Sequence, residues 1–302
     1  MPKVSIGIPV YNGERFLPEA LDSMLNQEVE DFELIVSDNA SEDRTEEVAR
    51  SYCERDPRVR YHRNEVNVGL VANFNRVFEL STGPYFRWAA SDDVLESHYL
   101  TRCVEVLDSD PGVVLAASEV RLIEADGSPV RFDEMAGHHV TRYGEELQSV
   151  DFPPALGSYA VTERFRDVVM SLTSNPLASC IYGLGRRDAI ARSLPMQPYL
   201  GSEKVLLARL ALEGRLHIVP EELFVRRFHP EHFGMHTPKE AMKLINPASS
   251  KVHFTSGKQL YGYLGAIKTS GLGSSQKLRL TGVLLRKVAS VTGDRVTRVF
   301  RR

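Results

Sequence analysis

VSIGIPV, residues Val4–Val10, is an almost continuously apolar run that leads into the turn sequence Tyr11-Asn12-Gly13. A run of this kind is typical of a strand that is buried on both faces, as in a parallel sheet. After the turn, apolar residues between Phe16 and Leu25 recur at helical spacing. The opening of the chain therefore predicts a buried strand followed by an amphipathic helix.

Strand and helix patterns keep alternating up to about residue 120. Further strands are predicted at Leu34–Val36, at Val59–Tyr61, before Ala90 and at Val113–Ala117. Helices are predicted after Ser41, at Val71–Phe78 and at Tyr99–Leu107. Repeated strand–helix units indicate an α/β fold with a mostly parallel, doubly wound sheet of Rossmann-like type.

The pattern loosens between about Leu122 and Leu172, where we expect a substrate-specific excursion. Regular order returns with a strand-like run at Cys180–Leu184, a helix at Val205–Leu212 and a short strand at His217–Pro220. Proline and glycine residues then mark a boundary near residue 238. We expect a main region of residues 1–238, with halves 1–120 and 121–238, and a helical extension of residues 239–302.

The net charge of −3 conceals a strong asymmetry along the chain. From Lys243 to Arg302 there are 12 Lys and Arg residues and one acid, Asp294, whereas the first 242 residues have 25 basic and 39 acidic residues, a net of −14. A basic tail on an acidic body predicts either an anionic membrane surface as a partner or docking of the tail on the body. Self-association into a homodimer is a further use of such a tail.

No uninterrupted apolar run approaches the ~20 residues needed to span a bilayer, and Met1 leads directly into a strand without a signal peptide. Cys53, Cys103 and Cys180 are far apart and lack the spacing of a metal site. These features predict a reduced, cytoplasmic protein, with peripheral attachment at the inner face of the membrane if the tail binds lipid.

Two polar clusters follow apolar runs: Ser37-Asp38-Asn39 and Ser91-Asp92-Asp93. The carboxyl ends of neighbouring parallel strands meet in one crevice, where open α/β sheets bind their ligands. One acidic tip can read a base or ribose, and the other can hold a divalent cation against phosphates. The sequence therefore points to a nucleotide-diphosphate ligand with a metal.

Five ordered segments resemble the large inverting glycosyltransferase family 2, whose members have the GT-A fold. The segments are Val4–Asn12, Ser37–Asp43, Asn67-Val68-Gly69 with Asn73 and Asn75, Ser91-Asp92-Asp93, and Gly201–Lys204. The resemblance covers roughly residues 1–230. It implies that residues 1–120 bind a nucleotide sugar and that residues 121–238 hold the acceptor and the catalytic base.

The resemblance implies a nucleotide site at the first strand tips. Pro9, Tyr11 and Asn12 would flank the base, with a turn and a core aromatic as the structural alternative. Asp38 would accept a hydrogen bond from the ring N–H of uracil or thymine, since an ionised carboxylate only accepts. A UDP- or dTDP-sugar is therefore favoured. The nucleotide-binding set is completed by Asn39, Asn67, Gly69, Asn73 and Ser91, although Asn67 and Gly69 can equally form a tight helix entry.

The diphosphate would be held by a metal and a basic cluster. Asp92 is expected to bind Mn²⁺ or Mg²⁺, and Asp93 to bind the metal or support it. An earlier Asp of the family pattern is replaced here by Ala90. By the same resemblance, Arg226 and Arg227 would lie near the diphosphate. The resemblance also makes His229 a third metal ligand or a phosphate contact.

Glu203 occupies the position of the family's catalytic base, which would take the proton of the acceptor hydroxyl during an inverting transfer. The family usually has an acidic pair there, whereas this chain has Ser202 before Glu203. A surface carboxylate in the first turn of a helix is the alternative, because it suits the helix dipole.

The sequence thus predicts a metal-dependent inverting glycosyltransferase acting on an acceptor hydroxyl in glycan, glycolipid or glycosylated-metabolite synthesis. A non-catalytic nucleotide- or carbohydrate-binding module is an alternative, because the Asp is missing at Ala90 and the base motif is altered. A nucleotidyltransferase would need a Gly-rich basic loop after the first strand, and a dinucleotide dehydrogenase would need G-x-G-x-x-G; this chain has neither there. No nucleic-acid partner is expected.

Overall fold

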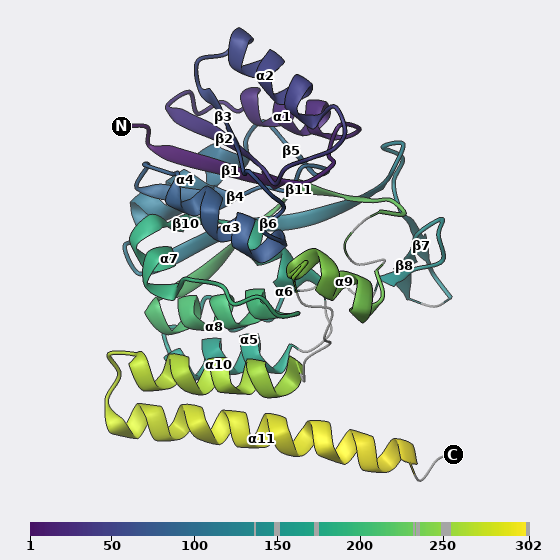
Figure 1. The fold of residues 1–302 in the computed structure, drawn as a ribbon. Helices are drawn as coiled ribbons and strands as arrows, with labels where there is room; N and C mark the ends of the chain where they lie inside the picture. The colour runs from purple at the N-terminus through teal and green to yellow at the C-terminus, as the bar shows by residue number, and fades with distance from the viewer. Residues whose placement is uncertain are drawn as a thin grey trace.

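The computed structural model describes residues 1–135, 137–147, 152–171, 175–231, 233, 236–248 and 255–299 (Figure 1). Eight strands form the main sheet: β1 (Val4–Val10), β2 (Phe32–Asp38), β3 (Val59–Arg63), β4 (Tyr85–Trp88), β5 (Val94–Leu95), β6 (Val113–Glu124), β10 (Leu184–Arg186) and β11 (Arg215–Phe228). Their order across the sheet is β3-β2-β1-β4-β10-β6-β11-β5.

Most neighbours in this sheet run parallel. Strands β1 to β4 pair in parallel, as do β6 and β11, while β10 and β5 pair antiparallel to their neighbours. Every residue of β1 and β2 is buried, because helices cover both faces and neither strand borders water. The predicted α/β fold, with a mostly parallel sheet and C-terminal helices, is confirmed.

The helices divide between the two faces of the sheet. One apolar cluster joins the sheet to α1 (Leu17–Leu25), α2 (Thr45–Arg55) and α4 (Tyr99–Ser109). The opposite cluster includes α3 (Leu70–Glu79), α5 (Val161–Met170), α7 (Arg187–Ser193) and α8 (Ser202–Glu213). This is the doubly wound arrangement that the alternating pattern predicts.

Shorter elements complete the described chain. A small separate sheet contains β7 (Arg131–Asp133), β8 (His138–Val140) and β9 (Glu146–Leu147). The helix α6 (Asn175–Ser179) and the 3-10 turn η1 (Cys180–Tyr182) precede β10. This part of the chain includes the segment whose sequence pattern is loose.

Register places the two polar clusters beside each other. Val10, the last residue of β1, pairs with Asp38, the last residue of β2. On the other side of β1, Gly7 pairs with Trp88, and the Ala89 N–H donates to the Gly7 carbonyl at 2.8 Å. The chain from Ala89 to Asp93 therefore leaves β4 next to the end of β1.

The C-terminal helices are α9 (Pro238–Ile245), α10 (Thr255–Thr269) and α11 (Ser274–Val299). Helix α10 packs on α8, and α11 lies along α10 and α5 at the edge of the molecule (Figure 1). Their inward side chains join the same apolar cluster as α5 and α8; these include Tyr263, Ile267, Leu280, Val283 and Leu284. The basic tail therefore contributes to the core of the protein.

The outward side of α11 is also partly apolar. Leu278 is 74% exposed and Leu285 is 67% exposed, one heptad apart along the helix. Arg279 and Arg286 are exposed next to them. No helix in the described ranges is long and apolar enough to cross a bilayer.

Leu284 and its neighbour Leu285 test whether the tail stabilises the fold. Leu284 is 1% exposed and Leu285 is 67% exposed. Leu284→Ala should lower the free energy of unfolding by about 2–4 kcal/mol, because it leaves a cavity in a packed core. The matched control Leu285→Ala should change it by less than about 0.5 kcal/mol. Urea denaturation measures both, and equal effects would mean that α11 does not pack as described.

Candidate active site

The ends of β1, β2 and β4 meet at one edge of the sheet. The Asn39 N–H donates to the Val10 carbonyl at 2.8 Å, which joins the tips of β1 and β2. A side-chain carbon built at Gly13 would lie 3.5 Å from Ser91 Oγ, so the turn after β1 also borders the loop after β4. The two polar clusters therefore converge, as their positions at strand ends predict.

The tip of β1 holds an exposed aromatic ring. Asn12 has φ of 54° in the turn, and its N–H donates to Ser41 Oγ at 2.9 Å. Its side-chain oxygen accepts from the Glu42 N–H at 2.9 Å. These bonds fix the turn and leave Tyr11 38% exposed, while Pro9 is buried within β1. Tyr11 is therefore accessible for stacking on a planar ligand.

Asp38 is fully buried below this tip. Its Oδ1 accepts from the Ser41 N–H at 2.9 Å, and its Oδ2 accepts from the Tyr61 hydroxyl and from Arg63, each at 2.6 Å. Arg63, at the end of β3, balances the charge of the carboxylate. These contacts hold Asp38 at the tip of β2, and its role as a base acceptor stays a prediction.

Four asparagines form a network beside Asp38. Asn39 Nδ2 donates to Asn67 Oδ1 at 2.8 Å, and Asn64 donates to both Asn39 and Asn73. Asn73 is buried and also donates to the Ser37 carbonyl at 2.7 Å. The side-chain amides of Asn39 and Asn73 both donate and accept, whereas Asn64 donates and Asn67 accepts, so the network joins the loops after β2 and β3 to α3. Nucleotide contact by Asn39, Asn67 and Asn73 stays a prediction.

The backbone at Gly69 leaves no room for a side chain. It has φ of 89°, and a side-chain carbon there would lie 2.4 Å from the Ile245 carbonyl of α9. The glycine therefore permits a tight helix entry and a close approach of α9 to the start of α3. This geometry favours the structural alternative for Gly69, and its nucleotide role remains a prediction.

The second tip is the loop Ala89–Asp93 that follows β4. Asp92 of this loop and His229 form its centre. His229 Nε2 lies 2.9 Å from Asp92 Oδ2, and His229 Nδ1 lies 3.0 Å from Glu231 Oε2. Burial alone would lower the pKa of His229, but its two carboxylate partners raise it above the ordinary value. Glu231 thus orients the imidazole ring toward Asp92.

Asp93 is buried and contacts the backbone of β11. Its Oδ1 accepts from the Arg227 N–H at 2.9 Å. Burial raises the pKa of Asp93, and the charge of Asp92 raises it further. This position favours the supporting role for Asp93 over direct metal binding.

Arg227 is buried and connects several segments. Its Nε donates to the Asp92 carbonyl at 3.0 Å, and its Nη2 lies 2.6 Å from Glu19 of α1. The guanidinium also lies 5.1 Å from the Phe16 ring centroid, and the His229 ring lies 4.7 Å from the same ring. Arg227 therefore positions the site, whereas the half-exposed Arg226 is the arginine with access to a ligand.

The residues present suit a hard cation. Among the described residues no group of three or more His, Cys, Asp or Glu is arranged to hold a metal by itself. Asp92 and His229 nevertheless supply one oxygen and one nitrogen donor at the same place. Mg²⁺ and Mn²⁺ sites commonly use one or two protein ligands and take the rest from phosphate and water. The donor set fits a cation shared with a diphosphate.

Glu203 lies in the first turn of α8. Burial raises its pKa above the ordinary value, and the nearby Lys204 lowers it in part. Gly201 precedes this turn with φ of 83°, and Gln259 of α10 donates to the Leu200 carbonyl at 3.3 Å. Helix α10 therefore supports the turn that carries the predicted base.

Tyr182 connects Glu203 to the second tip. Burial raises the pKa of the Tyr182 phenol, and the charges of Asp93 and Asp92 raise it further. The charge of Glu203 also raises the pKa of Tyr182, and the charge of Arg226 lowers it. One phenol therefore lies within the electrostatic range of both acidic groups, which brings the predicted base and the predicted metal ligand to one region.

Several site residues were not predicted from the sequence: Phe16, Glu19, Arg63, Asn64, Tyr182 and Glu231. Glu231 had a signal, since an acid two residues after a predicted metal-binding histidine can orient its ring. The others contact the site from distant segments, and no local pattern marks them.

Comparisons with known proteins identify relatives of this chain. The profile of "Glycosyl transferase family 2" matches residues 5–157. An uncharacterized glycosyltransferase of Rickettsia felis is 35% identical over 43% of this chain and 22% of its own length. Bacillus subtilis EpsJ, also an uncharacterized glycosyltransferase, is 35% identical over 35% of this chain and 30% of its own length. The Escherichia coli chondroitin synthase is 30% identical over 42% of this chain and 18% of its own length. The matched part thus spans less than a third of each relative.

Solved structures share the fold over nearly the whole chain. S. aureus TarS 1–349 in complex with UDP-GlcNAc has a TM-score of 0.62 at 16% identity and covers 93% of this chain and 71% of its own. The mannosyltransferase PcManGT of Pyrobaculum calidifontis, in complex with GDP-Man and Mn²⁺, has a TM-score of 0.54 at 15% identity, over 99% of this chain and 83% of its own.

The family match over half of the chain, together with a fold shared with solved structures over nearly its whole length, leads to one conclusion: this chain belongs to glycosyltransferase family 2.

Proposed function

We propose that this chain transfers a hexosyl group, with inversion, from a nucleotide-diphosphate sugar to an acceptor hydroxyl, and that the reaction depends on Mn²⁺ or Mg²⁺. The observation that carries the proposal is the convergence of the β1, β2 and β4 tips, where the exposed Tyr11 and the buried Asp38 meet the loop that bears Asp92. A leaving-group site and a base must both reach the same anomeric carbon. The Tyr182 phenol, which lies in the field of Asp92, Asp93 and Glu203, supports that arrangement.

The leaving diphosphate would be held at the second tip. A bound cation there would neutralise charge that develops on the diphosphate oxygens. Asp92 and His229 would hold it, and Glu231 would keep the His229 ring oriented. Arg226 would add positive charge on the same side, since its field acts on both Asp93 and Tyr182.

Glu203 would take the proton of the acceptor hydroxyl as that oxygen attacks. Its raised pKa brings the carboxyl closer to neutral pH, which makes it a stronger base while leaving it ionised at higher pH. Its place at the N-terminus of α8 moderates the effect of burial, because the helix dipole favours the charged form.

A UDP- or dTDP-sugar remains the favoured donor. Tyr11 would stack on the base, and Asp38 would accept from its ring N–H after exchanging a present partner. TarS binds UDP and UDP-GlcNAc, which supports a uridine donor, whereas PcManGT binds GDP-Man. Residues 1–120 would then serve the donor and residues 121–238 the acceptor and the base.

The extension of residues 239–302 would add a membrane function to its packing role. Leu278 and Leu285 are exposed on one side of α11, with Arg279 and Arg286 beside them. Apolar residues flanked by arginines suit the headgroup region of an anionic bilayer. The chain would then lie at the inner face of the membrane in the cytoplasm, near a lipid-linked or membrane-proximal acceptor.

A non-catalytic binding module is the second candidate. Two positions favour it, because Ala90 and Ser202 stand where members of the family that this sequence resembles usually have an acidic residue. A binding module would hold the donor without hydrolysing it. Slow, Mn²⁺-dependent release of UDP from a UDP-sugar would favour the enzyme.

Asp92→Asn tests the metal-binding tip. With Mn²⁺ present, affinity for a UDP-sugar should fall by at least about tenfold, because a charged ligand is lost. With a chelator in place of Mn²⁺, wild type and variant should bind alike. Titration calorimetry measures both conditions. Asp31→Asn, an exposed site at the opposite end of β2, is the control and should bind as the wild type does. Wild-type, metal-dependent affinity in Asp92→Asn would contradict the assignment.

Glu203→Gln tests the base. Turnover should fall by about 10²-fold or more while donor affinity stays the same, since a general base acts on the chemical step. In the wild type, activity should be lost as the pH falls through the raised pKa of Glu203, above the ordinary carboxylate range. This acidic limb should disappear in the variant. Glu213→Gln, at the far end of α8, is the control. Near-wild-type turnover in Glu203→Gln would assign the base to another carboxylate.

Leu278→Glu combined with Leu285→Glu tests the membrane surface. Both side chains are largely exposed, so the fold should persist while co-sedimentation with phosphatidylglycerol vesicles is lost. Wild-type binding should weaken with added salt. Val66→Glu, at another exposed apolar site, is the control. Vesicle binding that survives the double substitution would exclude this surface. A homodimer that dissociates in the double variant, without any vesicle binding, would identify it as a self-association surface.

A further inference from the structure

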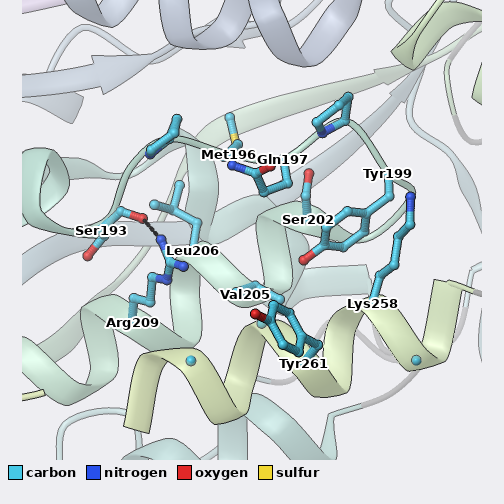
Figure 2. Close-up of a pocket in the computed structure, with 15 residues that line it drawn as sticks. Ser193, Met196, Gln197, Tyr199, Ser202, Val205, Leu206, Arg209, Lys258 and Tyr261 are labelled. Atoms are coloured by element: carbon cyan, nitrogen blue, oxygen red, sulfur yellow. Dashed lines mark hydrogen bonds between the residues drawn. The ribbon is translucent and has the colours of Figure 1, made fainter. Parts of the chain in front are cut away.

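A cavity of about 820 Å³ lies between α8, α10 and the loop that joins α7 to α8 (Figure 2). Its walls come from Ser193 at the end of α7, from residues 195–199 of the loop, from one side of α8 and from the glycine-containing side of α10. A cavity of this size matches the range that encloses a small organic ligand. It is separate from the two strand tips.

The charges around the cavity have one sign. Arg209 and Lys258 line it at opposite ends, and none of the described lining residues is Asp or Glu (Figure 2). A ligand with a negative charge would therefore meet two cations and no opposing carboxylate in the wall.

Aromatic and apolar groups make up much of the remaining wall. Tyr199 and Tyr261 project into the space from the loop and from α10, with Met196 and Val205 nearby (Figure 2). Sugar rings combine hydroxyl groups with apolar C–H faces that pack on aromatic rings. The wall suits a ring of this kind better than a bare inorganic anion.

One end of the cavity holds polar groups that lack partners. Arg209 Nη1 donates to the Ser193 carbonyl at 2.8 Å, which fixes the guanidinium in place. Arg209 Nε and Ser193 Oγ are both buried and have no hydrogen-bond partner among the described residues. Buried polar groups normally find partners, so their presence indicates a place where a bound molecule or water would complete the hydrogen bonding.

The other end of the cavity borders the turn that carries Glu203. Ser202 lines the cavity and directly precedes Glu203 in α8. Burial raises the pKa of the Tyr199 phenol, the charge of Arg209 lowers it, and the charge of Glu203 raises it. Tyr199 therefore lies in the field of Arg209 at one end of the cavity and of Glu203 near the other. A molecule that fills the cavity would therefore reach the turn that carries the proposed base.

We propose that this cavity is an acceptor subsite that binds a saccharide unit carrying a negative charge, either a carboxylate or a phosphate. The inference rests on the proposed function, because it takes Glu203 as the base that receives the acceptor. Arg209 and Lys258 bind the anionic groups, and Tyr199 and Tyr261 pack against the ring. The attacking hydroxyl belongs to the end of the acceptor nearest Ser202.

Gly265 offers a way to fill the cavity without disturbing the fold. It lines the cavity on α10, and a side-chain carbon built there meets no atom within 4 Å. Gly265→Leu should therefore occupy the cavity. Gly282 of α11 also has no atom within 4 Å of a built side-chain carbon and does not line the cavity, so Gly282→Leu is the matched control. Leucine is a better helix former than glycine, and both variants should keep or raise their melting temperature.

The probes are tetragalacturonate, glucose 6-phosphate and the neutral cellotetraose, titrated by calorimetry into the full chain without any donor. At least one anionic probe should bind, and the neutral probe should bind more weakly. Lys258→Gln should reduce the affinity of the anionic probe by about tenfold, the effect of one charge-assisted hydrogen bond. Gly265→Leu should abolish binding, and Gly282→Leu should leave it unchanged. The anionic probe that binds identifies carboxylate or phosphate as the charged group.

Three results would overturn the proposal: no binding of either anionic probe, binding that survives Gly265→Leu, or equal loss in both leucine variants. Because no donor is present, the outcome is independent of the metal-binding tip. Asp92→Asn protein that has lost donor binding should still bind the anionic saccharide. A chain that binds and hydrolyses a UDP-sugar but ignores every anionic probe would overturn the subsite alone.

Discussion

The site depends on the contacts that the buried side chain of Arg227 makes. This buried guanidinium donates to the Asp92 carbonyl, pairs with Glu19 of α1 and lies against Phe16, while its own N–H is bound by Asp93. A buried guanidinium is costly unless its charge is paired and its N–H groups are hydrogen-bonded, so these contacts fix the side chain in one place. The turn after β1, the loop after β4 and the end of β11 are therefore held in one geometry, and Asp92 and His229 meet only within it.

Much of the fold was predictable because strands buried on both faces leave continuous apolar runs. Val4–Val10 was predicted with its observed bounds, and the helix predicted at Val205–Leu212 lies within α8. The two-residue β5 and three-residue β10 were not predicted as such, since so short a strand has no period to detect. Helix α5 lies within the region whose pattern is loose, and its place is set by packing on α8 and α11.

The site was predictable at its strand ends and not in its contacts. Asp38, Asp92 and Tyr11 occupy the edge where their positions after apolar runs placed them. The partners of Asp38 are 23 and 25 residues away, and Tyr182 reaches the acidic groups from η1. Contacts over such separations depend on the packed sheet. The family match ends at residue 157, before Glu203, whereas the shared fold covers 93% of the chain in TarS, so similarity in sequence is concentrated in the first half of the chain.

The packing of α10 on α8 has a consequence for the order in which the protein matures. Gln259 supports the turn before Glu203, and Tyr263 and Leu284 complete the core under α8 and α5. These residues are made after the strands whose tips form the site. Domains begin to fold from the N-terminus as they emerge from the ribosome. A nascent chain can thus bring its strand tips together early, whereas the turn that carries Glu203 is fixed only once α10 has docked on α8.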